Sequence, residues 1–82
     1  MITMKQVQSS TIKEIGHDEQ ASKLLVRFNS GTLYEYDDVT KEEYSSIIND
    51  PSIGSKLRRI IGSKEYRKVE SIPAKRWMIL KE

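Results

Sequence analysis

The sequence predicts an α+β fold, an antiparallel β-meander followed by two short helices and a C-terminal arm. Three observations lead to this prediction. Apolar residues alternate with period two in the first half of the 82-residue chain, the spacing becomes helical after Val39, and another apolar segment follows Pro73. A chain of this length forms one domain with a modest core. We therefore expect the helices to pack on a small sheet.

A β-hairpin is the clearest element. Residues 23–28 alternate between apolar and polar faces, which is typical of a half-buried strand. A turn at Gly31, a residue that adopts positive φ without steric cost, leads into the β-prone residues 32–36. Tyr34 and Tyr36 then lie on one face of the second strand.

The segment before the hairpin predicts one or two further strands, over residues 6–10 and 11–15. The segment is expected to end at residues 16–18, so His17 is expected in a loop. The meander would then contain three or four strands.

The first helix is predicted to begin at Thr40, because Thr40 and Glu43 form a capping-box pattern. Its apolar stripe is expected to pack on the sheet and consists of Tyr44, Ile47 and Ile48. A second helix is predicted to follow, with Asp50 as N-cap and Pro51 at the first helical position, and to end at Gly62. Its apolar stripe is Ile53, Leu57, Ile60 and Ile61.

The last part of the chain differs in charge from the first. Residues 1–50 carry five basic and nine acidic residues, a net charge of −4, whereas residues 51–82 carry nine basic and three acidic residues, a net charge of +6. We divide the chain into a domain over residues 1–62 and a basic, apolar extension over residues 63–82. The run from Trp77 to Leu80 is too apolar to remain in water, so we expect the extension to pack on the same domain or on a neighbouring subunit. A homo-oligomer is the expected assembly.

The residue types needed for catalysis or metal binding are scarce. The chain has no cysteine and one histidine, His17, for which we expect a surface or turn role. The paired carboxylates, at residues 37–38 and 42–43, are adjacent in sequence, so their side chains diverge and do not form a catalytic dyad. We therefore predict a protein that is not an enzyme and has no cofactor or metal. No apolar run is long enough for a membrane span and no signal pattern opens the chain, which predicts a cytoplasmic protein without membrane association.

Three groups of residues are candidates for ligand binding. The start of the second helix combines backbone N–H groups, hydroxyls, a glycine and cations, the set that holds phosphate: Ser52, Gly54, Ser55, Lys56, Arg58 and Arg59. A solvated helix face is an equally good interpretation of these cations. Tyr34 and Tyr36 have the geometry to stack on bases, although we favour core packing under Tyr44 and Ile48. The cluster Lys75, Arg76 and Trp77 fits either a nucleobase with its phosphate or docking of the tail.

The sequence resembles the KTSC domain family over roughly residues 5–61. The resemblance rests on the spacing Val7-x-Ser9-Ser10-x-Ile12, Ile15-Gly16-x-Asp18, Leu24-x-Val26-x-Phe28-x-x-Gly31-x-x-Tyr34-x-Tyr36-x-x-Val39 and, further on, Tyr44 and Ser52-x-Gly54. Copies of this domain lie at the C-terminus of some lysyl-tRNA synthetases. The resemblance implies a small accessory domain linked to nucleic acid, and it brings no catalytic residues.

Together these observations predict a non-enzymatic binding module for an anionic, nucleotide-containing ligand. The ligand is either RNA or a small nucleotide that is held or sequestered between protomers. The alternative is a protein-binding module, such as a phage-borne inhibitor that occludes a host enzyme or defence protein with its apolar tail.

Overall fold

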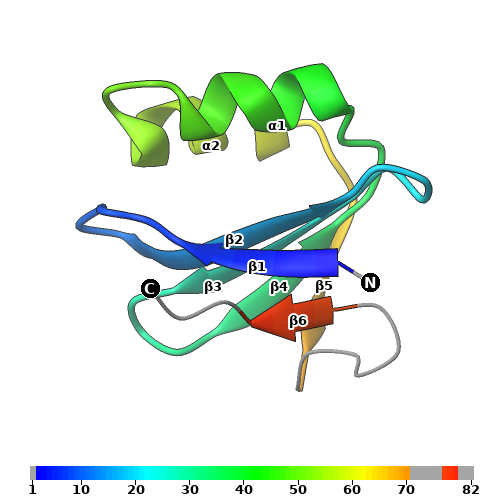
Figure 1. Ribbon diagram of the computed structural model, residues 1–82, viewed down its shortest axis with the longest axis horizontal. Coiled ribbons are helices and arrows are strands. Elements are labelled where there is room, and N and C mark those ends of the chain that lie inside the picture. The colour runs from blue at the N-terminus through cyan, green and yellow to red at the C-terminus, as the bar shows by residue number, and fades with distance from the viewer. Residues whose placement is uncertain (1, 71–76, 80–82) are drawn as a thin grey trace.

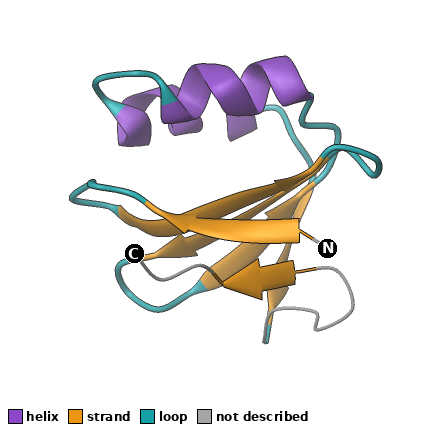
Figure 2. Cartoon of the chain, in the orientation of Figure 1, coloured by secondary structure: helices purple, strands orange, loops and turns teal. Residues whose placement is uncertain are grey.

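The protein is a two-layer structure in which two helices lie over one face of a single sheet (Figures 1 and 2). The computed structural model describes residues 2–70 and 77–79, with side chains for residues 4–70. The elements are β1 Ile2–Gln6, β2 Ile12–Asp18, β3 Lys23–Phe28, β4 Leu33–Tyr36, α1 Lys41–Ile48, α2 Ile53–Ile61, β5 Tyr66–Val69 and β6 Trp77–Ile79. The predicted α+β fold, a meander followed by two helices, is confirmed.

The strands are ordered β5-β4-β3-β2-β1-β6. Neighbours from β1 to β5 pair antiparallel, and β6 pairs parallel to β1. Both β5 and β6 come from residues 63–82 and are strands of the same sheet as the rest of the domain. Residues 71–76, which include Lys75 and Arg76, lie outside the described residues.

The predicted hairpin is confirmed as β3 and β4. Its turn is closed by the Phe28 N–H, which donates to the Thr32 carbonyl at 2.9 Å. Gly31 has a φ of 95°, the conformation that only glycine adopts without strain.

The strands before the hairpin depart from the prediction. The first is β1, Ile2–Gln6, rather than residues 6–10, and β2 extends to Asp18. His17 therefore lies within β2 and not in a loop, and this prediction was wrong. Pairing with β3 continues through Asp18, opposite Lys23, and the same register places Leu24 across from His17.

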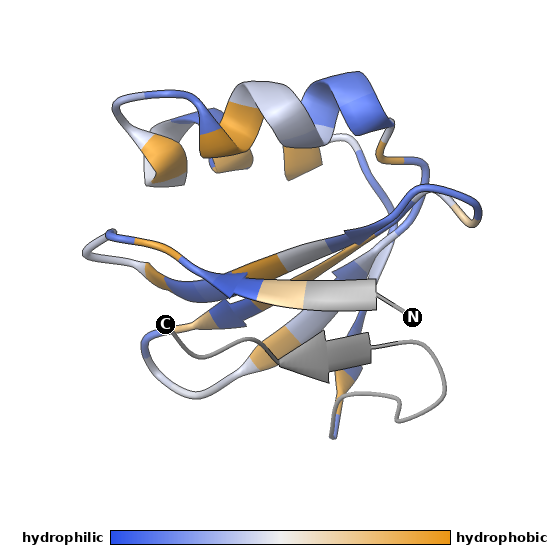
Figure 3. Cartoon of the chain, in the orientation of Figure 1, coloured by the Kyte–Doolittle hydropathy of each residue, from blue (hydrophilic) through white to orange (hydrophobic). Residues whose placement is uncertain are grey.

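The main core lies between the sheet and the helices. Figure 3 shows apolar residues on the side of the helices that faces the sheet. The buried members of this core come from β2, β3, β4, the segment before α1 and both helices: Ile12, Ile15, Leu24, Val26, Tyr36, Val39, Ile47 and Leu57. The predicted stripes of both helices contribute, since Tyr44, Ile48, Ile53, Ile60 and Ile61 pack against this cluster.

The two helix starts differ. At α1 the predicted capping box is present: Glu43 N–H donates to the Thr40 hydroxyl at 3.1 Å, and Thr40 N–H donates to the Glu43 carboxylate at 2.9 Å. At α2 the N-cap is Ser52 and not Asp50, and Pro51 precedes this cap rather than occupying the first helical position. The Asp50 carboxylate instead accepts a hydrogen bond from the Ser52 N–H at 2.8 Å. This bond closes a turn just before the helix, which begins at Ile53. The predicted end of this helix at Gly62 is confirmed.

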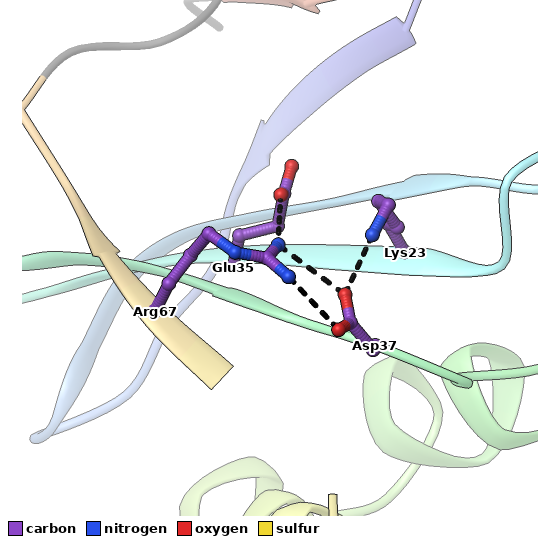
Figure 4. A network of polar contacts seen from close by, with 4 residues as sticks. All are labelled: Lys23, Glu35, Asp37 and Arg67. Atoms are coloured by element: carbon purple, nitrogen blue, oxygen red, sulfur yellow. Dashed lines mark hydrogen bonds and ion pairs between the residues drawn. The ribbon is translucent and has the colours of Figure 1, made fainter. Parts of the chain in front are cut away.

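The other face of the sheet holds a second, smaller core of Met4, Leu25 and Leu33. Charged side chains surround it, and Figure 4 shows one network that joins β3, β4 and β5. Arg67 donates to Glu35 at 2.6 Å and to Asp37 at 2.9 Å, and Lys23 donates to Asp37 at 2.6 Å. These hydrogen bonds from Lys23 and Arg67 lower the pKa of Asp37. These charge-assisted hydrogen bonds therefore stabilise the pairing of the edge strand β5 with β4.

Within residues 2–70 and 77–79, no helix has the length and apolar character that crossing a bilayer requires.

Candidate ligand-binding site

A polar hollow lies between the β1–β2 loop and the beginning of α2. We call it the serine hollow, and it encloses about 300 Å³. Three successive hydroxyl residues of the loop face the first turn of the helix across it. Its lining residues are Gln8, Ser9, Ser10, Thr11, Pro51, Ser52, Ile53, Gly54, Ser55 and Arg58.

The β1–β2 loop is held in place by its own hydroxyl and by the neighbouring hairpin turn. The Ser9 hydroxyl oxygen accepts from the N–H groups of Thr11 at 3.1 Å and Ile12 at 3.2 Å. The Asn29 side chain donates to the Ser9 carbonyl at 3.1 Å, and the Asn29 N–H donates to the Thr11 carbonyl at 2.8 Å. Ser9 is thus used by the turn, as expected for a hydroxyl at a strand end. Ser10 lies in this hydrogen-bonded loop and is exposed.

The start of α2 offers donors to the serine hollow. Among the described residues no side chain caps the first turn of the helix, because the Ser52 hydroxyl donates to the Ser55 hydroxyl at 3.0 Å instead. The first-turn N–H groups of an uncapped helix point outward with partial positive charge. No acidic residue lies in this turn. Gly54 brings the backbone close to the loop, since a Cβ at this position would lie 3.7 Å from the Thr11 hydroxyl.

One of the three predicted cations lines the serine hollow. Arg58 lies one turn after Ser55 on α2, is exposed, and forms no ion pair with any carboxylate in the described part of the chain. Lys56 and Arg59 line neither this hollow nor its neighbour. The structure therefore separates Arg58 from the cations that the sequence grouped with it.

A second hollow adjoins the first and shares Ser10 and Thr11 with it. We call it the aromatic hollow; it is wide and open to solvent, with a volume of about 540 Å³. Phe28 and Tyr34 form its apolar side, with their rings edge to face and their centroids 5.9 Å apart. Its remaining lining is polar and comes from the β3–β4 turn: Asn29, Ser30 and Thr32.

The other predicted residues lie elsewhere. Tyr36 is 5% exposed within the main core, and this burial raises its pKa to about 12, so the ring offers no face to a ligand. The backbone of Trp77 is in β6, opposite Ile2, while its side chain lies outside the described residues, as do Lys75 and Arg76.

His17 has a structural environment. Its Nε2 donates to the Val39 carbonyl at 2.6 Å, and its ring stacks on Tyr44 with the centroids 5.2 Å apart. These contacts join β2 to the start of α1. In the described part of the chain, no group of three or more metal-ligating side chains is gathered.

A known protein family matches the part of the chain that contains both hollows. The sequence matches the KTSC domain over residues 8–66, which takes in every residue that lines the two hollows. The chain belongs to the KTSC domain family. This match ends five residues later than the resemblance described above, at the first residue of β5.

The chain is also similar to an uncharacterized protein and to a KTSC domain protein of known structure. An uncharacterized protein of Stutzerimonas stutzeri (strain A1501) is 33% identical over 66 residues, which span 78% of this chain and 93% of the relative. The crystal structure of a KTSC domain protein from Yersinia pestis superposes with a TM-score of 0.80 at 26% identity, covering 84% of this chain and 99% of the other. The match leaves β6 of this KTSC protein outside the family region.

Several lining residues of this KTSC domain were not predicted as site residues. They are Gln8, Ser9, Ser10, Thr11, Phe28, Asn29, Ser30, Thr32, Pro51 and Ile53. The serine pair and the hairpin turn were visible in the sequence, but nothing in their spacing placed them against residues 52–58. That neighbourhood arises only when the sheet forms and α2 packs on it.

Proposed function

We propose that this KTSC domain is a non-enzymatic binding module for an anionic ligand that contains a nucleotide. The observation that carries this proposal is that the two hollows lie side by side and share Ser10 and Thr11 in their linings. One hollow offers groups suited to phosphate, and the other offers aromatic rings beside polar groups. A nucleotide has the same two parts joined in one molecule.

The phosphate would be held in the serine hollow. Backbone N–H groups at a helix start and a guanidinium are groups that commonly bind phosphate in proteins. The first turn of α2 and Arg58 supply both on the same side of the hollow. Hydroxyls of Ser10 and Ser55 add further donors. Because Arg58 has no ion-pair partner within the described residues, a phosphate does not have to compete with a carboxylate for it.

The base would lie in the aromatic hollow. Phe28 and Tyr34 provide apolar ring surface for stacking, which suits any base because each has a π-face. The hydroxyls and amide of Asn29, Ser30 and Thr32 suit the polar edge of a base or a ribose. The Asn29 amide already donates to the Ser9 carbonyl, which fixes its orientation.

A ligand series tests this proposal. The affinities of adenosine monophosphate, adenosine and inorganic phosphate are measured by isothermal titration calorimetry or NMR titration at low salt. We expect the nucleotide to bind more tightly than either of its parts, because it fills both hollows. Equal affinity for phosphate and nucleotide would show that the aromatic hollow is unused and would contradict the proposal, as would absence of binding by all three.

Replacing Gly54 with Ala separates binding from stability. The added Cβ lies in ordinary van der Waals contact, 3.7 Å from the Thr11 hydroxyl and 3.8 Å from the Ser9 hydroxyl, so no clash arises. Alanine favours a helix over glycine by roughly 0.5–1 kcal/mol. We expect urea denaturation to show an equal or higher free energy of unfolding, while the affinity for the mononucleotide falls because the methyl group enters the serine hollow. Unchanged affinity in a stable variant would place the phosphate elsewhere.

The remaining predictions on assembly and partners stay predictions. Sequestration between protomers requires the homo-oligomer that we expect from the sequence. The alternative, a protein-binding role for the tail, depends on side chains at residues 77–80 that lie outside the described residues.

A further inference from the structure

One aromatic side chain of the sheet is left in solvent. Tyr66, at the start of the edge strand β5, is 63% exposed, whereas the other large hydrophobic side chains among residues 4–70 are buried or partly buried. Its ring nevertheless contacts two others, with centroids 5.6 Å from that of Tyr34 and 5.8 Å from that of Tyr36. The ring is therefore positioned by its neighbours while one side of it remains free.

These contacts make a continuous row of rings. Phe28 of β3 meets Tyr34 of β4 edge to face, and Tyr34 meets Tyr66 of β5 in the same way. The row begins in the aromatic hollow, which Phe28 and Tyr34 line, and ends at the edge of the sheet. A mononucleotide that fills the two hollows reaches Tyr34 and leaves Tyr66 unused.

A free cation lies next to the end of this row. Lys68 is opposite Tyr34 in the β4–β5 register and two residues from Tyr66, so all three side chains are on the same face of the sheet. Lys68 is exposed and makes no ion pair with any described residue. Arg67, between them in sequence, projects to the opposite face and is engaged by Glu35 and Asp37. On the face that carries the rings, the charge of Lys68 is therefore not neutralised by a described carboxylate.

We propose, on the basis of the function proposed above, that the ligand is a single-stranded oligonucleotide rather than a mononucleotide. One nucleotide occupies the two hollows, a following base stacks on Tyr66, and a phosphate of the following nucleotide meets Lys68. Alternating aromatic and cationic contacts of this kind match the alternation of bases and phosphates along a single strand. Double-stranded nucleic acid does not fit, because its bases are stacked on one another and offer no free faces to the rings.

Ligand length and Tyr66 variants test the proposal together. The affinities of adenosine monophosphate and a four-residue oligoadenylate are measured by calorimetry for the wild type, Tyr66→Ala and Tyr66→Phe. We expect the oligonucleotide to bind the wild type at least 10-fold more tightly. Tyr66→Ala should weaken oligonucleotide binding roughly 5- to 150-fold, the range of base stacking on a protein ring, and leave mononucleotide binding unchanged. Tyr66→Phe keeps the ring and should behave as the wild type.

The charge contact is tested by Lys68→Ala against Lys5→Ala. Lys5 is an exposed cation of β1, on the far side of the strand order from β5. Each phosphate contact of a single strand contributes about 0.7 to the slope of log affinity against log salt. Lys68→Ala should lower this slope for the oligonucleotide by about that amount, and Lys5→Ala should not change it.

The outcomes separate this inference from the proposed function. Equal affinity for both ligands in the wild type, or equal loss for both ligands in Tyr66→Ala, would overturn the oligonucleotide proposal while leaving the mononucleotide site in place. Absence of binding by either ligand would overturn both.

Discussion

Replacing Leu57 with Ala is expected to lower the free energy of unfolding by about 2–5 kcal/mol, the usual cost of removing most of a fully buried leucine side chain. Leu57 is 1% exposed and is the buried residue through which α2 joins the main core. The deletion removes apolar contacts and leaves a cavity between the helix and the sheet. Chemical denaturation followed by circular dichroism measures the change.

The matched control is Ile60→Ala on the same helix. Ile60 is only partly buried against the core, so its truncation should cost clearly less. A Leu57 variant as stable as the wild type would mean that α2 does not depend on this contact. The position of α2 over the β1–β2 loop, and with it the serine hollow, would then need another explanation.

Replacing Arg58 with Ala is expected to weaken mononucleotide binding roughly 10- to 150-fold, which corresponds to the 1.5–3 kcal/mol of a hydrogen bond to a charged group. The guanidinium lines the serine hollow, and no described carboxylate pairs with it. Removing a charge contact should also make the remaining affinity less sensitive to salt. Titrations at two salt concentrations measure both effects.

Arg59→Ala is the control for this prediction. Arg59 is the next residue of α2, is also exposed, and lines neither hollow. Both variants change the net charge by the same amount, so a general electrostatic attraction would weaken binding equally in both. Equal losses would therefore contradict a specific phosphate contact at Arg58.

The local signals in the sequence were enough for most of the fold. The period-two pattern at residues 23–28, the glycine turn and the Thr40–Glu43 capping box act over a few residues, and the strand, the turn and the cap that they predict are present in the structure. The strand is not half-buried as predicted, because Leu25, on the face away from the helices, is fully buried in the second core. His17 was misplaced because a glycine and an aspartate beside a histidine resemble a turn, whereas the pairing of β2 with β3 continues through Asp18. Asp50 was misplaced as a cap because Asp and Ser are equally good caps, and the choice of Ser52 depends on the turn that Asp50 itself closes.

The candidate site was harder to predict. Ser52, Gly54, Ser55 and Arg58 could be chosen from the sequence because helix-start donors and a cation on one helix are local features. Ser10 and Thr11 complete the hollow from more than forty positions earlier in the chain, and the contact of Thr11 with Gly54 depends on how α2 crosses the sheet. Tyr34 and Tyr36 lie on the same face of β4 but differ in burial. Tyr36 is buried in the main core, whereas Tyr34 is partly buried against that core and also lines the aromatic hollow.

The proposal that the two hollows form one nucleotide site is tested most directly by a ¹⁵N–¹H NMR titration with adenosine monophosphate. The amide signals of Ser10, Thr11, Gly54 and Ser55 report on the serine hollow, and those of Phe28 and Tyr34 report on the aromatic hollow. We expect both sets to shift with a common dissociation constant, while the signals of β6 remain unchanged. Shifts confined to residues outside both hollows, or no shift at millimolar nucleotide, would contradict the proposal.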